Sequence, residues 1–192
     1  MLFRSPSRLA AGPLVLRRWS DDDAVPLGAA VLDSVHHLRP WMPWAAAEPI
    51  ELEARRQLIA EWARQWAAGR EYVYGMWAEG TVVGGCGLHA RLAGPGLEIG
   101  YWVHAGHLRR GYATSAAGGL TSAAFELPEL AYVEIRHDRA NLASGRVPAT
   151  LGFTRIGEEP REREAPAESG TTVIWRMRRE TWLARERQRV GP

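Results

Sequence analysis

The fold of this chain is decided by two neighbouring stretches, LEIGYWV at residues 97–103 and HLRRGYAT at residues 107–114. The first contains the β-branched and aromatic residues that favour a strand. The second leads through Gly111 into a run of small residues, which predicts a slim helix over 112–125. The first amides of a helix have no internal partner and attract anions, and a glycine there lets an anion approach the backbone. The two stretches therefore predict a strand, a phosphate-binding loop and a helix.

A second junction between a strand and a helix follows at residues 132–151. Tyr132–His137 is typical of a strand, and Asn141, the one asparagine of the chain, begins a predicted helix that ends at Leu151. An asparagine at this place either caps the helix or offers its amide to a ligand, because the amide both donates and accepts. Taken alone, Asn141 is more simply an N-cap.

The remaining pattern indicates one mixed α/β domain at residues 14–178, between a flexible tail at 1–13 and a basic tail at 179–192. The charged segment 158–170 is expected to be a mobile loop. A crossover through the helix after Gly111 indicates one parallel strand pair. Further strands are expected at 14–19, 72–77, 81–88, 153–157 and 171–177, and further helices at 20–37 and 50–68.

Composition excludes several classes of function. The 24 basic residues, all arginine, face 22 acidic ones, and a net charge of +2 gives no electrostatic footprint for DNA or RNA. The single cysteine, Cys86, excludes an internal disulfide and a cysteine-based zinc site. No stretch reaches the roughly 18 apolar residues of a membrane span. The N-terminal apolar run is interrupted by Gly12-Pro13 and fails as a signal peptide, so we expect a cytoplasmic protein with no membrane partner.

Three motifs point to other chemistry but lack the context that it needs. GCGLHA at residues 85–90 matches a dinucleotide fingerprint, yet Gly94-Pro95-Gly96 would end the helix that such a site requires. Small residues that let strands pack closely are the better interpretation. His104 and His107 lie in a loop without a third ligand nearby, which argues against a metal site. Cys86, among glycines on a predicted strand, is expected to be a buried, unreactive thiol.

Taken together, the motifs resemble the GNAT superfamily of acyl-CoA N-acyltransferases, and within it the RimJ/RimL-like group that acetylates protein N-termini. The resemblance rests on EIGYW at 98–102, RGYAT at 110–114, Asn141-x-x-Ser144 with LGF at 151–153, and HLRPWMPW at 37–44. It implies the GNAT fold, a central twisted, mostly antiparallel sheet of about seven strands with a parallel, splayed pair in the middle and flanking helices.

The resemblance also implies the reaction and the residues that perform it. A primary amine, for this group a protein or peptide α-amino group, would attack acetyl-CoA directly, without a metal. Ser144 would protonate the leaving thiolate and Glu98 would act as the general base; a helix-surface hydroxyl and a strand-end surface charge are the alternatives. A second candidate base is Glu162 or Glu164. The acetyl-CoA would contact Tyr101, Trp102, Val103, Arg109, Arg110, Gly111, Tyr112, Ala113, Thr114 and Asn141.

Trp41 and Trp44, in the proline-rich segment, are candidates to line the acceptor site, with core packing as the alternative. Two positions depart from the family pattern. Leu108 stands where the phosphate loop has Gln or Arg, and Pro148 falls inside a predicted helix, where it removes a backbone hydrogen bond. These departures leave open a non-catalytic acyl-CoA sensor. A small-molecule amine or antibiotic as acceptor, a larger acyl group such as succinyl, and a monomer or a homodimer also stay open.

Overall fold

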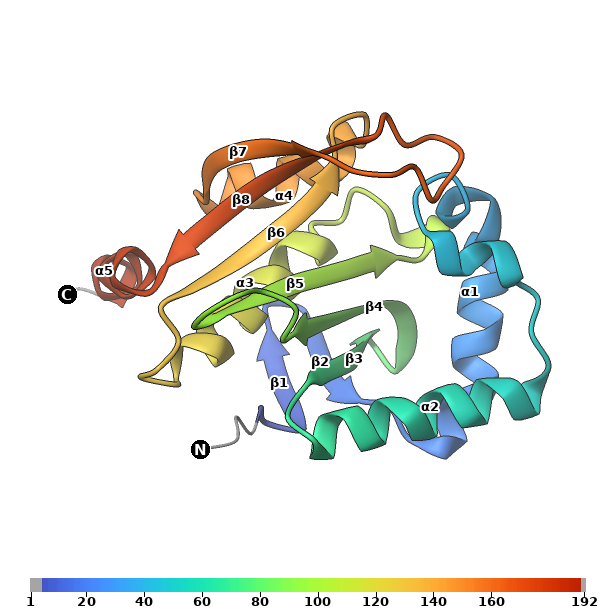
Figure 1. Cartoon of the computed structure of the whole chain (residues 1–192). Coiled ribbons are helices and arrows are strands. Elements are labelled where there is room, and N and C mark those ends of the chain that lie inside the picture. The colour runs from blue at the N-terminus through green and yellow to red at the C-terminus, as the bar shows by residue number, and fades with distance from the viewer. Residues whose placement is uncertain (1–4, 191–192) are drawn as a thin grey trace.

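The computed structural model describes residues 5–190, which form an eight-stranded sheet flanked by helices (Figure 1). The spatial order of the strands is β1-β2-β3-β4-β5-β6-β8-β7, and every neighbouring pair is antiparallel except β5 and β6. This confirms the expected GNAT fold. The strands are β1 (Arg8–Ala11), β2 (Leu14–Arg18), β3 (Glu71–Ala78), β4 (Thr81–His89), β5 (Gly96–Val103), β6 (Tyr132–Asp138), β7 (Thr154–Pro160) and β8 (Thr171–Arg178).

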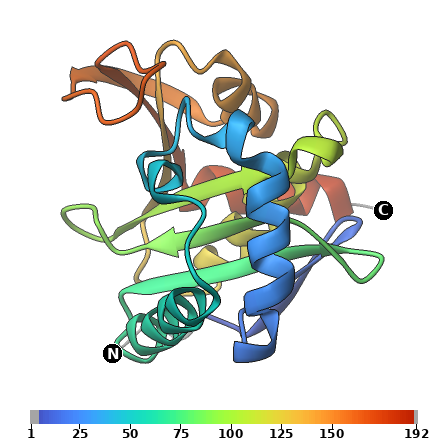
Figure 2. The same cartoon turned by 90° about the vertical axis from the view of Figure 1, so that its right-hand side faces the viewer.

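Helices cover both faces of the sheet (Figures 1 and 2). Strand β3 demonstrates the two faces, because its side chains alternate between two cores. Tyr72 and Tyr74 lie in the core that contains α3, whereas Val73 packs against the cluster built by α1 and α2. The helices are α1 (Ala24–Leu38), α2 (Leu52–Ala67), α3 (Tyr112–Phe125), α4 (Leu142–Leu151) and α5 (Arg179–Val190), with short 3-10 turns η1 (Asp21–Asp23), η2 (Pro43–Ala47) and η3 (Ala105–His107).

The parallel pair in the middle of the sheet is short. Strands β5 and β6 are in register only where Gly96–Glu98 faces Tyr132–Glu134. Beyond this point β6 follows β8 to Asp138, while β5 follows β4 to Val103. Within residues 5–190, the edge of β5 after Glu98 therefore has no strand partner on the β6 side, and the two central strands diverge.

Residues 8–11 and 179–190, within the two predicted tails, form regular elements, whereas residues 1–4 and 191–192 of those tails lie outside the described residues. Arg8–Ala11, placed in the flexible tail, form β1, so the sheet has eight strands where about seven were expected. Gly12, with φ +58°, turns the chain so that β1 pairs with β2. Helix α3 packs against β1. At the other end, the basic tail contains α5. The Trp182 side chain of α5 is 4% exposed and donates from Nε1 to Ser122 Oγ of α3 at 3.2 Å.

The loop between β7 and β8, expected to be mobile, is held by hydrogen bonds at residues 161–170. Asp138 Oδ2 accepts from the amides of Ser169 and Gly170, at 2.9 and 3.2 Å. The amide of Ala167 donates to the carbonyl of Pro40 at 3.0 Å, which joins the loop to the segment between α1 and α2. In Figure 1 this loop reaches from the β7–β8 end of the sheet toward η2. No helix within residues 5–190 is both long and apolar enough for a membrane span.

Candidate active site

The divergence of β5 from β6 is accompanied by two clefts that share part of their walls. The α3 cleft, with a volume of about 450 Å³, is lined by the end of β5, the loop that enters α3 and the first turns of α3 and α4. The β4 cleft, with a volume of about 540 Å³, is lined by β3, β4, β5, β6 and the segment between α1 and α2. Two molecules bound in the two clefts would meet at the residues that line both, which are Trp41, Met42, Tyr101, Trp102, Asn141 and Ser144.

The wall of the α3 cleft is made largely of backbone and small side chains. Gly111 adopts φ +76° as the N-cap of α3, a left-handed conformation that favours glycine, and a Cβ there would meet nothing within 4 Å. The amides of the first turn, Tyr112–Thr114, precede the first helical donor, Ser115, whose amide bonds to the Gly111 carbonyl at 2.9 Å. These amides and the positive end of the helix dipole can bind an anion.

The side chains of the loop before α3 contribute less than its backbone. Arg109 lines the α3 cleft and has φ +58°, which turns the chain into the helix. Arg110 is exposed and is not among the residues that line the cleft. Leu108 lines it with 40% of its surface exposed, so the position that departs from the family pattern offers an apolar contact.

Ser144 lies at the junction of the clefts, at the start of α4. Its amide donates to Asn141 Oδ1 at 3.1 Å, so Asn141 is the N-cap of α4, and both residues line both clefts. The Tyr101 hydroxyl lies 3.0 Å from the Ser144 carbonyl and 3.1 Å from Ser144 Oγ. Burial raises the pKa of Tyr101, although the bond to Ser144 opposes this, so the phenol keeps its proton at neutral pH.

Pro148 explains why the Ser144 carbonyl accepts from a side chain. The residue four positions after Ser144 would normally donate its amide to that carbonyl, and proline has no N–H. Helix α4 nevertheless runs through Pro148 to Leu151. The Tyr101 hydroxyl replaces the missing donor and ties α4 to β5 across the split in the sheet.

The floor of the β4 cleft is a ladder of cross-strand pairs between β4 and β5. His89 faces Glu98, Gly87 faces Gly100, and Gly85 faces Trp102. The glycines leave room for the large side chains of the neighbouring rungs. A Cβ at Gly85 would lie 2.5 Å from Trp102 Nε1, and a Cβ at Gly87 would lie 3.0 Å from His89 Nε2. The sequence GCGLHA, which matched a dinucleotide motif, is thus a glycine floor beneath two rings.

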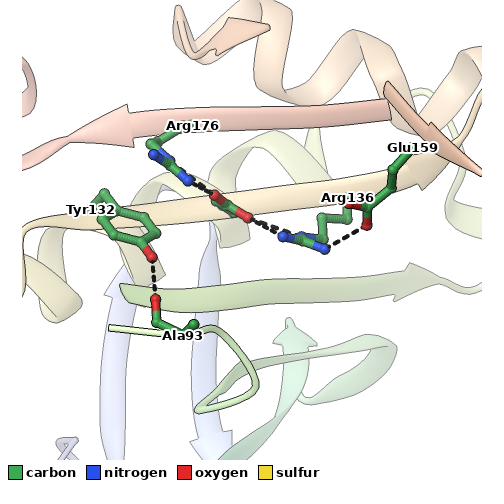
Figure 3. Close-up of polar contacts among 6 residues, drawn as sticks. Ala93, Tyr132, Arg136, Glu159 and Arg176 are labelled. Carbon is green, nitrogen blue, oxygen red and sulfur yellow. Dashed lines mark hydrogen bonds and ion pairs between the residues drawn. The ribbon is translucent and has the colours of Figure 1, made fainter. Parts of the chain in front are cut away.

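Charged groups of β6, β7 and β8 form a network (Figure 3), and its central residue, Glu134, is the register partner of Glu98 on β5. The Glu134 side chain is 1% exposed and accepts from Arg136 Nε and Arg176 Nε, each at 2.9 Å. Arg136 also lies 2.9 Å from Glu159 of β7. Although burial lowers it, the carboxylates of Glu134, Glu159 and Glu98 raise the pKa of Arg136. The adjacent carboxylates of Glu98 and Glu134 are therefore balanced by arginine charges.

The segment between α1 and α2 is fixed by a buried ion pair and carries both candidate tryptophans. Arg55 Nη2 lies 2.6 Å from Glu48 Oε2, and both side chains are almost fully buried. Arg39 Nη2 donates to the Glu48 carbonyl at 2.5 Å. Trp41 lines both clefts, whereas Trp44 lines the β4 cleft and packs edge-on against Trp102 with ring centroids 6.2 Å apart.

The structure brings together most of the predicted site residues and separates a few. Glu98 lines the β4 cleft, but Glu162 and Glu164 line neither cleft. Cys86 is buried, which raises the pKa of its thiol. Within residues 5–190, no three side chains of His, Cys, Asp or Glu are arranged to hold a metal ion. Sequence reasoning missed the hydroxyl contact of Tyr101 with Ser144, and it assigned no role to His89.

Comparison with known protein families matches residues 13–154 to the family model described as Acetyltransferase (GNAT) domain. A relative in Bacillus subtilis (strain 168), named "Putative ribosomal N-acetyltransferase YdaF", is 28% identical over 146 residues, which cover 76% of this chain and 80% of that protein.

Solved structures share the fold over most of both chains. RimL, a ribosomal L7/L12 alpha-N-protein acetyltransferase in complex with coenzyme A, has a TM-score of 0.82 and 16% identity, covering 91% of this chain and 99% of that one. Mycobacterium smegmatis RimJ, in complex with CoA-disulfide, has a TM-score of 0.75 and 22% identity, covering 94% of this chain and 92% of that one.

Proposed function

The chain belongs to the GNAT family of acetyltransferases, and from that premise we propose that it moves an acetyl group from acetyl-CoA to a primary amine, with a protein or peptide α-amino group as the acceptor. The observation that carries the proposal is the pair of clefts that meet at Tyr101, Trp102 and Ser144. One cleft is built for a phosphate-bearing donor and the other is lined by charged groups suited to a polar acceptor.

The α3 cleft fits the donor. The amides of Tyr112–Thr114, with Arg109 beside them, would bind the pyrophosphate of CoA. The free edge of β5 at Tyr101–Val103 would pair with the amides of the pantetheine arm, as an added strand pairs with a sheet edge. Asn141 caps α4 through Oδ1, which leaves its Nδ2 group to donate to the arm. The thioester would supply the activated acetyl group at the junction.

The junction residues would perform the transfer. The amine nitrogen bonds to the acetyl carbon and the carbon–sulfur bond breaks, while a backbone amide near Val103 stabilises the oxyanion. Ser144 Oγ would give its proton to the thiolate, and the Tyr101 hydroxyl, 3.1 Å away, would hold that hydroxyl in place. Glu98, on the β4 cleft side, would attract the ammonium form of the acceptor.

Pro148 and Leu108, the two departures that left a non-catalytic sensor open, are compatible with catalysis. Ser144 stays at the junction of the clefts despite Pro148. The proline cannot donate to the Ser144 carbonyl, and the Tyr101 hydroxyl donates to it instead. Leu108 replaces a side-chain contact, but the amides of the first turn of α3 do not depend on it. The geometry therefore favours turnover over passive binding.

Proton chemistry favours an α-amino group as the acceptor. A free α-amine has a pKa of about 8 and a lysine side chain one of about 10.4. At pH 7 the fraction of each amine that is neutral therefore differs by roughly two orders of magnitude. The printed name of RimL, a ribosomal L7/L12 alpha-N-protein acetyltransferase, supports the same acceptor class, and the Bacillus subtilis relative is named as a putative ribosomal N-acetyltransferase.

A competition assay with two peptides of one sequence tests the proposal. One peptide is blocked at its N-terminus and keeps its lysine, and the other has a free N-terminus with lysine replaced by arginine. We expect acetyl transfer to the free N-terminus, measured by mass spectrometry and by thiol release from acetyl-CoA. Preferential acetylation of the blocked peptide contradicts the α-amine assignment, and turnover only with small amines selects that acceptor class.

A further inference from the structure

His89 lines the β4 cleft and belongs to the GCGLHA motif, in which the sequence analysis gave it no role. It ends β4, and its side chain is 12% exposed. Its Nε2 lies 3.0 Å from the Cβ position of Gly87 and 3.2 Å from that of Gly100, which are a cross-strand pair. The ring thus leaves its own rung, opposite Glu98, and lies over the next rung toward Trp102. This direction leads to the junction where the two clefts meet.

The other ring nitrogen of His89 is held by a carboxylate. His89 Nδ1 lies 2.8 Å from Glu71 Oε2, and Glu71 Oε1 accepts from Arg91 Nη2 at 2.9 Å. Although burial raises it, the bonds from His89 and Arg91 lower the pKa of Glu71 to about 2. An ionised carboxylate only accepts, so Nδ1 carries the hydrogen and Nε2 of the neutral ring presents a lone pair to the cleft.

The second histidine that lines the β4 cleft, His137, lacks this property. Its Nε2 accepts from Trp175 Nε1 at 3.0 Å, and its Nδ1 lies 2.7 Å from the Asp138 carbonyl, to which it donates. Both ring nitrogens of His137 are thus used by the fold. His89 uses one, and no hydrogen bond joins its Nε2 to another residue of the described chain.

We propose that His89, oriented by Glu71, is the residue that accepts the proton of the acceptor amine; this inference rests on the proposed acetyl transfer. As the nitrogen–carbon bond forms, the carbon–sulfur bond breaks with its electron pair on sulfur, and one amine proton passes to His89 Nε2. The thiolate takes the Ser144 proton, and the imidazolium proton returns through water to that hydroxyl. The products are the amide and the free thiol.

The charges around His89 suit this role. Glu71 of β3 stabilises the imidazolium, as a carboxylate does for a catalytic histidine. Glu98 of β5, the cross-strand neighbour, adds a negative charge that attracts the ammonium form of the amine. Arg91, beyond β4, and Arg136 of β6 are the positive groups on this side, and each is paired with a carboxylate, Glu71 and Glu134 respectively. His89 is then the catalytic base, and Glu71 is a positioning residue.

The test compares His89→Gln and Glu71→Gln with the wild type at saturating acetyl-CoA and peptide. We expect kcat to fall by roughly 10²–10⁴ for His89→Gln and by about tenfold for Glu71→Gln. In His89→Gln the pH–rate profile should also lose its rise on the acid side. The affinity for CoA, measured by calorimetry, should stay within about twofold. His36→Gln, a histidine change outside both clefts, is the matched control.

The outcomes separate this inference from the proposed function. No turnover by the wild type would contradict the acetyl transfer itself. A wild type that turns over, with His89→Gln within threefold of it and an unchanged pH profile, overturns the role of His89. Nitrogen-15 NMR of the wild-type imidazoles adds a readout that needs no variant. The Nδ1–H tautomer of His89 supports the inference, and the Nε2–H tautomer overturns it.

Discussion

The two clefts that meet at Ser144 are built by opposite means. The α3 cleft takes its anion-binding wall from one continuous segment, in which β5, Gly111 and the first turn of α3 follow one another. The β4 cleft takes its charged groups from strands and loops far apart in the chain, such as Glu71, Glu98, Arg136 and Glu168. The first depends on backbone amides and the second on side-chain charges.

This difference teaches where each function can be altered. Most substitutions leave backbone amides in place. An anion site made of amides is therefore disturbed by replacing the glycine that sets the backbone conformation, or by adding a charge beside the amides. Side-chain charges are changed one residue at a time. Changes in the α3 cleft should alter the affinity for CoA, and changes in the β4 cleft should alter acceptor chemistry and local stability.

The largest expected effect lies at the junction. Ser144→Ala should lower kcat by roughly 10²–10⁴ and leave CoA affinity nearly unchanged, because the proton donor is lost while the cradle stays. Steady-state kinetics and calorimetry measure the two quantities, with Thr154→Ala as a hydroxyl deletion outside both clefts. A kcat change of less than about threefold would retire Ser144 as the proton donor.

Gly111→Asp should weaken CoA binding by about 100-fold or more, because its carboxylate would stand against the phosphates at the start of α3. Gly111→Asn is the matched control, since asparagine has nearly the same shape, tolerates the left-handed conformation and carries no charge. Calorimetry checks the affinities and circular dichroism checks the fold. Equal affinities of the two variants would show that charge at this point does not matter.

In the β4 cleft, Glu71→Gln should lower the free energy of unfolding by an amount that depends on pH. The folded pKa of Glu71, about 2, lies below its ordinary value of 4.5. The ionised form therefore stabilises the fold above pH 4.5, and this contribution is lost as pH falls from 4.5 toward 2. After allowance for solvent screening we expect a loss of about 1–2 kcal/mol at neutral pH. Urea unfolding should show the two proteins converging in acid; a constant difference contradicts the ion pairing.

The smallest effect is the coupling between Tyr101 and Pro148. Tyr101→Phe leaves the Ser144 carbonyl without a donor, whereas in a Pro148→Ala background the new amide at 148 supplies one. Tyr101→Phe should therefore cost about 1 kcal/mol less stability in that background than in the wild type. Thermal or urea unfolding of the four proteins gives the coupling, and additive losses would show that the phenol does not replace the helical donor.

Sequence reasoning succeeded where the signal is local. Strand β5, the turn at Gly111 and helix α3 were predicted at their observed positions, because strand composition, a left-handed glycine and a small-residue helix are properties of adjacent residues. It failed for β1, since RLAA at residues 8–11 has no strand signature. Those residues become a strand by pairing with β2 and packing under α3.

By itself, then, the sequence determined the family, the order of the main strands and helices, the anion-binding turn and the candidates Asn141, Ser144 and Glu98. Only the tertiary structure decided how side chains distant in the chain are combined. Glu71 meets His89 because β3 and β4 pair in a register that contains a bulge near Met76 and Trp77. Tyr101 reaches Ser144 because the sheet splits after Glu98. Register and divergence depend on the packing of whole strands, which no local pattern of residues specifies.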